Sequence, residues 1–295
     1  MILNVVLKII LRSWWRNKVF FLVSVASLAL GLACTNLLMT YFVHEHGLEG
    51  RNSDRDRMFF LRQDDPMTEG KRVAFAGAEI PPQLKQSYAE VENFLRLGKL
   101  DLLYCKVNEQ KVEGDFKMLS ADTTLTSFFD YRTEEGSLSQ VLCQPGKVAL
   151  SEACARRLFG GKQAVGKQVE AHFRFGEVRT YEVAAVLRER EQSLLQFDML
   201  IAHDPDFFWG GLTLLKLTPG TDAGHLADKL NEDKVPTLMP GQTKYYLDPL
   251  DAICFTTPDD SSQQTLDFVS QTPVQTLYIL SLIHISEPTR PLYIS

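Results

Sequence analysis

The sequence VFFLVSVASLALGLACTNLLMTYFV, residues Val19 to Val43, decides the architecture of this chain. It holds 25 consecutive residues without a charge. A helix rises ~1.5 Å per residue, so the run reaches about 37 Å, and the hydrocarbon core of a bilayer is about 30 Å thick. A helix that is apolar on all sides over this length is typical of a membrane span. The stretch therefore predicts one transmembrane helix at residues 19–43.

Two processing signals fit the same stretch less well. A cleaved signal peptide has an apolar region of about 7 to 15 residues and then a small-residue cleavage site, and this run is longer. The segment GLAC, Gly31 to Cys34, faintly resembles a lipoprotein processing site, but the sequence stays apolar beyond Cys34. An uncleaved membrane anchor is the favoured interpretation.

The 18 residues before this run carry Lys8, Arg12, Arg16 and Lys18 and no acid. Three of the four basic residues recur every four positions, which places a polar stripe on an otherwise apolar helix. Residues 1–18 are therefore predicted to form an interfacial amphipathic helix that contacts membrane lipid. Because basic flanks are retained in the cytoplasm, the N-terminus is predicted inside and the rest of the chain outside.

Within the predicted span, Ser27, Gly31 and Thr35 also recur at intervals of four. Small side chains on one face allow a second helix to approach closely in lipid, so this stripe is a candidate packing surface. Random scatter of small residues in a membrane helix explains the pattern equally well.

The formal net charge of the chain is −6, and the first 18 residues contribute +4, which leaves −10 for the rest. This acidic balance argues against a nucleic-acid-binding surface. Five scattered cysteines form no CxxC motif and leave disulfide pairing open.

Short strand-like and helix-like patterns alternate irregularly after the span, which predicts an α+β domain at residues 44–273 rather than a doubly wound sheet. The expected strands are residues 58–63, 72–76, 93–97, 102–107, 116–119, 178–187 and 211–217. The expected helices are residues 81–91, 151–159 and 222–233, with Ser151 as an N-cap and Gly160 as a stop for the second.

Residues 161–168, GKQAVGKQ, resemble a phosphate-binding loop but lack the final Ser or Thr that holds magnesium. A helix is expected before this segment and a strand after it, which is the reverse of the order that such a loop needs. The histidines are isolated, and no nucleophile or paired-carboxylate motif stands out. The prediction is a non-enzyme without cofactor or metal.

Four phrases of the sequence together resemble one family, the permease subunits of MacB/FtsX-type ABC transporters with a MacB-like periplasmic core domain. They are LRSWWRNKVFFLVSVASLALGLAC at Leu11–Cys34, EIPPQLKQSYAEVENFLRL at Glu79–Leu97, GKVALSEACARRLFGGKQAVGKQVE at Gly146–Glu170 and YEVAAVLRE at Tyr181–Glu189. The resemblance implies a bacterial inner-membrane subunit with a periplasmic domain. It also implies three kinds of partner: an ABC ATPase on a separate cytoplasmic chain, a second permease copy or homologue, and a periplasmic client or adaptor.

The end of the sequence departs from this family. Residues 274–285 begin like a second transmembrane helix, but apolar sequence stops after about 10 residues, too few to cross a bilayer. Residues 286–295 resemble a translated sequencing adapter, so we expect a truncated permease that couples ATP hydrolysis to export or to mechanical work in the periplasm. The alternatives are a single-span extracytoplasmic binding or scaffold protein and a membrane-tethered hydrolase.

Overall fold

The computed structural model describes a large part of the chain. Its described residues are 18–46, 53–65, 67–161, 163–174, 176–188, 193–204, 210–236, 244–256, 268–269 and 272–273. They fall into two units, a helix that ends at His46 and a domain within Gly47–Pro273. Each unit is described by itself.

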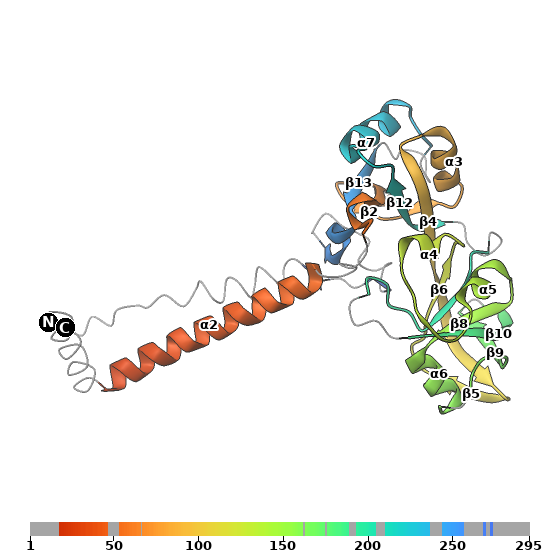
Figure 1. The fold of residues 1–295 in the computed structure, drawn as a ribbon, viewed down its shortest axis with the longest axis horizontal. Coiled ribbons are helices and arrows are strands. Elements are labelled where there is room, and N and C mark those ends of the chain that lie inside the picture. The colour runs from red at the N-terminus through yellow and green to blue at the C-terminus, as the bar shows by residue number, and fades with distance from the viewer. Residues whose placement is uncertain are drawn as a thin grey trace. The chain divides into compact units, whose positions relative to one another are not determined.

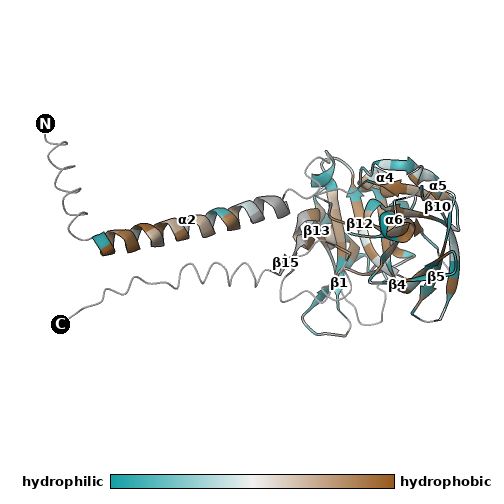
Figure 2. Ribbon diagram, turned by 90° about the horizontal axis from the view of Figure 1, so that it is seen from below, coloured by the Kyte–Doolittle hydropathy of each residue, from teal (hydrophilic) through white to brown (hydrophobic). Residues whose placement is uncertain are grey.

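The first unit is helix α2 (Lys18–His46), which contains the predicted span. Large apolar side chains such as Phe20, Leu28 and Leu32 are exposed. The helix that Figure 1 labels α2 has mainly apolar colour in its first half (Figure 2). The part from Lys18 to Leu37 is long and apolar enough to cross a membrane. No residue of this part is buried against the described chain, which is typical of a helix whose solvent is lipid.

The domain is built on one mixed sheet of 13 strands. In pairing order, nine of them are β13 (Tyr245–Pro249), β1 (Met58–Asp64), β12 (Gly210–Leu217), β4 (Val91–Val107), β6 (Lys117–Ala121), β11 (Met199–Ala202), β8 (Lys147–Ser151), β10 (Val178–Leu187) and β7 (Thr133–Gly136). Four more pair beside this path: β2 (Arg72–Val73) with β1, β3 (Ala76–Gly77) with β12, β5 (Gln110–Glu113) with β4, and β9 (Gln168–Phe173) with β10 and β4. A separate parallel pair joins β14 (Phe255–Thr256) and β15 (Thr272–Pro273).

Short helices pack on this sheet. They are α3 (Ile80–Ser87), α4 (Leu125–Phe128), α5 (Leu138–Cys143), α6 (Glu152–Phe159) and α7 (Ala223–Glu232), with 3-10 turns η1 (Arg55–Arg57) and η2 (Leu250–Cys254). Parallel pairs β6–β11 and β8–β10 lie among antiparallel neighbours. This mixture confirms the predicted α+β class.

Strand β4 links the two halves of the domain, the one with α3 and α7 and the one with α5 and α6 (Figure 1). Its first part pairs with β12, its middle with β6, and its last part with β9 and β5. The sequence predicted two separate strands here, with turn residues between them. Pairing with β6, which includes Gly98 opposite Ser120, keeps the strand unbroken between its β12 and β9 partners.

The helix predicted at residues 81–91 is shorter in the structure. α3 ends at Ser87, and Tyr88 is already extended with φ −122° and ψ 111°. Val91 then pairs with Leu217 of β12 and is 4% exposed. Burial of this β-branched residue in the sheet outweighs the helical pattern of the sequence before it.

The predicted ends of α6 are confirmed. The Ser151 Oγ accepts a hydrogen bond from the backbone N–H of Cys154 at 3.2 Å, which satisfies one of the free donors of the first turn. Gly160 has φ 63°, a left-handed conformation in which glycine ends a helix without strain. Strand β9 follows at Gln168, so the segment that resembles a phosphate loop is a turn from a helix into a strand.

The two faces of the sheet carry different cores, since successive residues of a strand alternate between faces. One face holds a continuous central core, to which β4 contributes Leu95 and Leu97. The other face holds two separate clusters. The α3–α7 core includes Leu215 of β12, and the α6 core includes Met118 of β6 and Ile201 of β11.

Gln63 of β1 is buried without a partner. Its side chain is fully covered, and neither its Oε1 nor its Nε2 has a hydrogen-bond partner among the described residues. Its cross-strand neighbours are Tyr245 and Val73. A buried amide in this state costs about 1 to 3 kcal/mol of desolvation.

We predict that Gln63→Leu stabilises the protein by about 1 kcal/mol, because an apolar side chain of similar size has no desolvated polar atoms. Thermal unfolding of the full chain in detergent measures the effect as a higher midpoint. Gln110→Leu on the exposed strand β5 is the matched control and leaves the midpoint nearly unchanged. A lower midpoint for Gln63→Leu would show that the amide has a stabilising role.

Candidate functional site: an ion-pair latch at the entry to the domain

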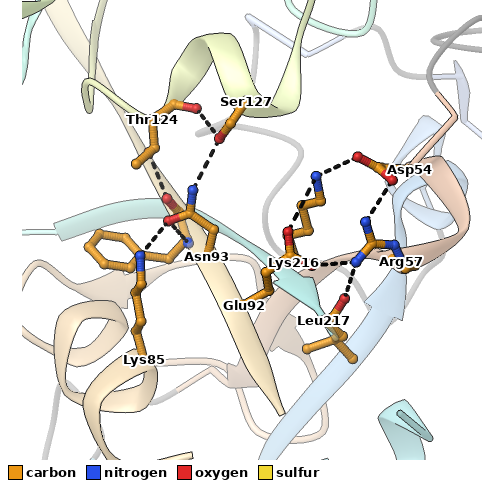
Figure 3. A network of polar contacts seen from close by, with 10 residues as sticks. Asp54, Arg57, Lys85, Glu92, Asn93, Thr124, Ser127, Lys216 and Leu217 are labelled. Atoms are coloured by element: carbon orange, nitrogen blue, oxygen red, sulfur yellow. Dashed lines mark hydrogen bonds and ion pairs between the residues drawn. The ribbon is translucent and has the colours of Figure 1, made fainter. Parts of the chain in front are cut away.

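Four charged side chains meet where the chain enters the domain, and we call them the entry latch (Figure 3). They are Asp54 and Arg57 around η1, Glu92 near the start of β4, and Lys216 near the end of β12. Asp54 follows the last residue of α2, His46, by only eight positions. The latch therefore joins the beginning of the domain to two central strands.

Each acid of the latch contacts both bases. The Arg57 Nη2 lies 2.6 Å from Asp54 Oδ1, and its Nη1 donates to Glu92 Oε2 and, at 2.9 Å, to the carbonyl oxygen of Leu217. The Lys216 Nζ donates to Asp54 Oδ2 and lies 3.6 Å from Glu92 Oε1. Two positive and two negative charges thus form a neutral, closed network.

Lys216 is the buried member of the network, with a side chain that is 10% exposed against 40% for Glu92. It lies between β1 and β4, because its cross-strand partners are Met58 and Asn93. A buried ammonium group needs acidic partners to offset its lost hydration. This requirement makes the position of Asp54, and with it η1, depend on β12.

Hydrogen bonds from Lys216, and then from Arg57, lower the pKa of Asp54 below its ordinary value of 3.8. The carboxylates Asp54 and Glu92 in turn raise the pKa of Arg57. A carboxyl group whose pKa is lowered by folding stabilises the fold above its ordinary pKa and loses that contribution as the pH falls further. Asp54 therefore stays ionised down to a lower pH than an ordinary aspartate does.

A second group of polar contacts lies beside the latch, around the first residues of β4 (Figure 3). The Lys85 Nζ of α3 donates to Asn93 Oδ1 at 3.0 Å, and the Asn93 Nδ2 donates to Ser127 Oγ of α4 at 3.1 Å. The Thr124 Oγ1 donates to the carbonyl oxygen of Phe94 at 2.6 Å. The start of β4 is thereby hydrogen-bonded to α3 and to α4.

The described residues at the far end of the domain are anchored as well. Phe268 and Val269 are 2% and 4% exposed in the central core. Val269 forms a β-bridge with Leu195, and the backbone N–H of Gln196 donates to the carbonyl oxygen of Phe268 at 2.6 Å. Strand β15 then pairs with β14 and ends at Pro273, the last residue of this unit.

The small residues proposed for helix packing lie on α2. The Thr35 Oγ1 donates to the carbonyl oxygen of Gly31 at 2.9 Å, which satisfies the hydroxyl within the helix. Ser27 and Thr35 are exposed and Gly31 is half-buried. A second helix against this stripe stays a prediction.

Of the predicted basic flank, Lys18 is the first residue of α2. Lys8, Arg12 and Arg16, and the amphipathic helix predicted around them, lie outside the described residues. Residues 274–295, with the expected second span and tail, lie outside them too.

Sequence analysis singled out none of the four latch residues. The spacing of Asp54 and Arg57, three positions apart, was the available local signal. Lys216 lies 162 positions from Asp54, and nothing in the sequence marks the two as partners. Among the described residues, no three His, Cys, Asp or Glu side chains gather as metal ligands would.

We predict that Asp54→Asn and Lys216→Met each lower the unfolding midpoint of the full chain in detergent. The double variant should lose less than the sum of the two single losses, because both substitutions break the same interaction. The exposed pair Lys111 and Glu113 of β5, 2.6 Å apart, provides the control, and its removal should change the midpoint little. Additive losses for Asp54 and Lys216 would contradict the latch.

The sequence from residue 21 to residue 233 matches the family model of the MacB-like periplasmic core domain. No curated protein matches the sequence at a significant level. Several solved structures resemble the fold. A domain of a protein described as a permease from Porphyromonas gingivalis has a TM-score of 0.53 at 19% identity, over 77% of this chain and 98% of that one.

The periplasmic region of MacB from Actinobacillus actinomycetemcomitans has a TM-score of 0.48 at 10% identity, over 68% of this chain and 91% of its own. The extracellular domain of the noncanonic ABC-type transporter YknZ from Gram-positive bacteria has a TM-score of 0.48 at 13% identity, over 64% of this chain and 98% of its own. Because the family model covers most of the sequence, including nearly all of α2 and the four latch residues, this chain belongs to the family of proteins with a MacB-like periplasmic core domain.

Proposed function

We propose that this chain is a permease subunit of an ABC transporter and that it passes movement between the membrane and its extracytoplasmic domain. Family membership supports a permease, and the domain is expected to work without catalysis of its own. ATP would be hydrolysed by an ABC ATPase on a separate cytoplasmic chain. The observation that carries the proposal is the entry latch, which fixes Asp54, eight residues after α2, to the central strands.

The division of the chain follows from this proposal. Residues 1–18 lie on the cytoplasmic face of the membrane, 19–43 cross it, and 44–273 form the extracytoplasmic domain. The basic residues before the span support this orientation. A second permease copy would pack against the stripe of Ser27, Gly31 and Thr35, and a client or adaptor would contact the outer domain.

Within the domain, the proposed route of movement begins at η1. The latch holds η1 to β12 and β4. Strand β4 then extends to the far half of the domain, where it pairs with β9 and β5. Packed elements joined by hydrogen bonds move as bodies, so displacement at Asp54 reaches both halves.

Hydrogen exchange of the purified membrane complex tests this route. We predict that an ABC ATPase co-purifies with the chain and that ATP with vanadate changes amide protection at residues 54–64. Lys216→Met should keep the ATPase bound and abolish this change, because η1 is no longer held to β12.

Lys111→Met, which breaks an ion pair far along the chain from the entry, is the matched control and should behave as the unmodified protein does. Absence of an ATPase from the complex, or a nucleotide response that survives Lys216→Met, would contradict the proposal. The first outcome would favour a single-span binding or scaffold protein.

The orientation has its own test in cells. In a variant without other cysteines, Ser53→Cys should react with a membrane-impermeant maleimide in intact cells, because the proposed topology puts this residue on the outer side of the membrane. Asn4→Cys should react only after permeabilisation. The opposite pattern would reverse the proposed topology.

A further inference from the structure

A row of polar side chains crosses the sheet on the face that carries two separate cores. Thr213 of β12 pairs directly with Arg96 of β4. Asp122 follows β6, and its backbone N–H donates to the carbonyl oxygen of Arg96 at 3.4 Å. His203 follows β11, and its backbone N–H donates to the carbonyl oxygen of Ala121 at 2.8 Å. We call these four residues the polar row.

The centre of the polar row is one nearly buried ion pair. The Arg96 side chain is 17% exposed and that of Asp122 is 10% exposed. The Arg96 Nη2 lies 2.6 Å from Asp122 Oδ1, and its Nε lies 2.9 Å from Oδ2. The backbone N–H of Arg96 also donates to Asp122 Oδ2 at 2.8 Å, and its Nη1 donates to the carbonyl oxygen of Ala78 at 2.8 Å. Asp122 thus holds β4 through both side chain and backbone.

The polar row lies between the two halves of the domain. On its β12 side is the α3–α7 core, with Leu215 two residues from Thr213. On its β11 side is the α6 core, with Ile201 two residues from His203. Apolar packing on this face is therefore interrupted at the row, and here the halves are joined by charge and hydrogen bonds.

His203 is the titratable residue of the row whose ordinary pKa lies nearest to neutrality. Burial and the positive charge of Arg96 lower its pKa, while Asp122 and Asp204 act in the opposite direction. The Asp204 Oδ2 also accepts a hydrogen bond from Arg179 Nη1 of β10 at 2.6 Å. The folded domain therefore favours neutral His203.

We propose that the polar row is a proton-sensitive joint, in which a proton on His203 loosens the pairing of β4 with β6 and so the connection between the two halves. The added charge repels Arg96 and competes with it for Asp122, the carboxylate that also anchors the β4 backbone. An extracytoplasmic domain meets the pH of its surroundings directly, so this joint would couple the flexibility of the domain to external acidity.

The direction of the effect follows from proton linkage. A histidine whose pKa is lowered by folding binds its proton more weakly in the folded protein than in the unfolded chain. Stability is therefore full at neutral pH and falls as the pH drops below the ordinary histidine value of about 6.5. Asp54 of the latch does not contribute to this fall, because its lowered pKa keeps the carboxylate ionised in the same range.

Hydrogen exchange of the full chain in detergent, at about pH 7.5 and about pH 5.5 and corrected for the chemical exchange rate, tests the joint. We expect residues 93–98 and 119–123 to lose protection selectively at the lower pH. His203→Gln should abolish most of this loss, since its neutral side chain takes up no proton. His203→Asn is a second variant in case the first does not fold.

His172→Gln is the matched control, because His172 lies on β9 beside Glu170 and Tyr104, outside the polar row. It should retain the full pH response. An equal loss of protection in the unmodified protein and in the His203 variants would overturn the proposal. A loss spread evenly over the whole domain would overturn it as well, because it would show general acid destabilisation. Neither result bears on the coupling to an ATPase, so the two proposals can fail separately.

Discussion

Continuous backbone pairing along β4 is the constraint on which the rest of the domain depends. Seventeen residues of one strand serve β12, β6, β9 and β5 in turn, so the two halves share a single hydrogen-bonded ladder. Each backbone N–H and C=O group in a buried strand must be paired, which fixes the position of every neighbour relative to β4. Polar groups that lie on this strand, above all Glu92, Asn93 and Arg96, therefore act on both halves at once.

The membrane supplies the second constraint. In lipid a helix satisfies its backbone internally and needs no apolar partner, so α2 contacts its surroundings through side chains alone. The segment with which the domain begins must therefore be fixed by residues of the domain itself. The entry latch does this with a buried Lys216 that requires the carboxylates, and the central core fixes the described far end through Phe268 and Val269.

The sequence predicted features that depend on neighbouring residues, but not contacts between residues that are far apart in the chain. The uncharged run gave α2, and the Ser151 cap and Gly160 stop gave the ends of α6, because such signals lie within a few residues. The unbroken course of β4 through Gly98 was missed, since it depends on pairing with β6, a separate strand. The latch and the polar row were missed for the same reason: Lys216 and Asp54, or Arg96 and Asp122, meet only after the sheet forms. The small-residue stripe on α2 has no described partner against which to judge it.

The central claim is that the latch fixes the entry segment of the domain, around η1, to the central strands β4 and β12. Structures of the complete membrane assembly with and without ATP test it most directly. The account predicts that η1 and β4 shift together and that Lys216 stays in contact with Asp54 in both states. Movement of η1 relative to β4, or separation of Lys216 from Asp54 as ATP binds, would contradict it.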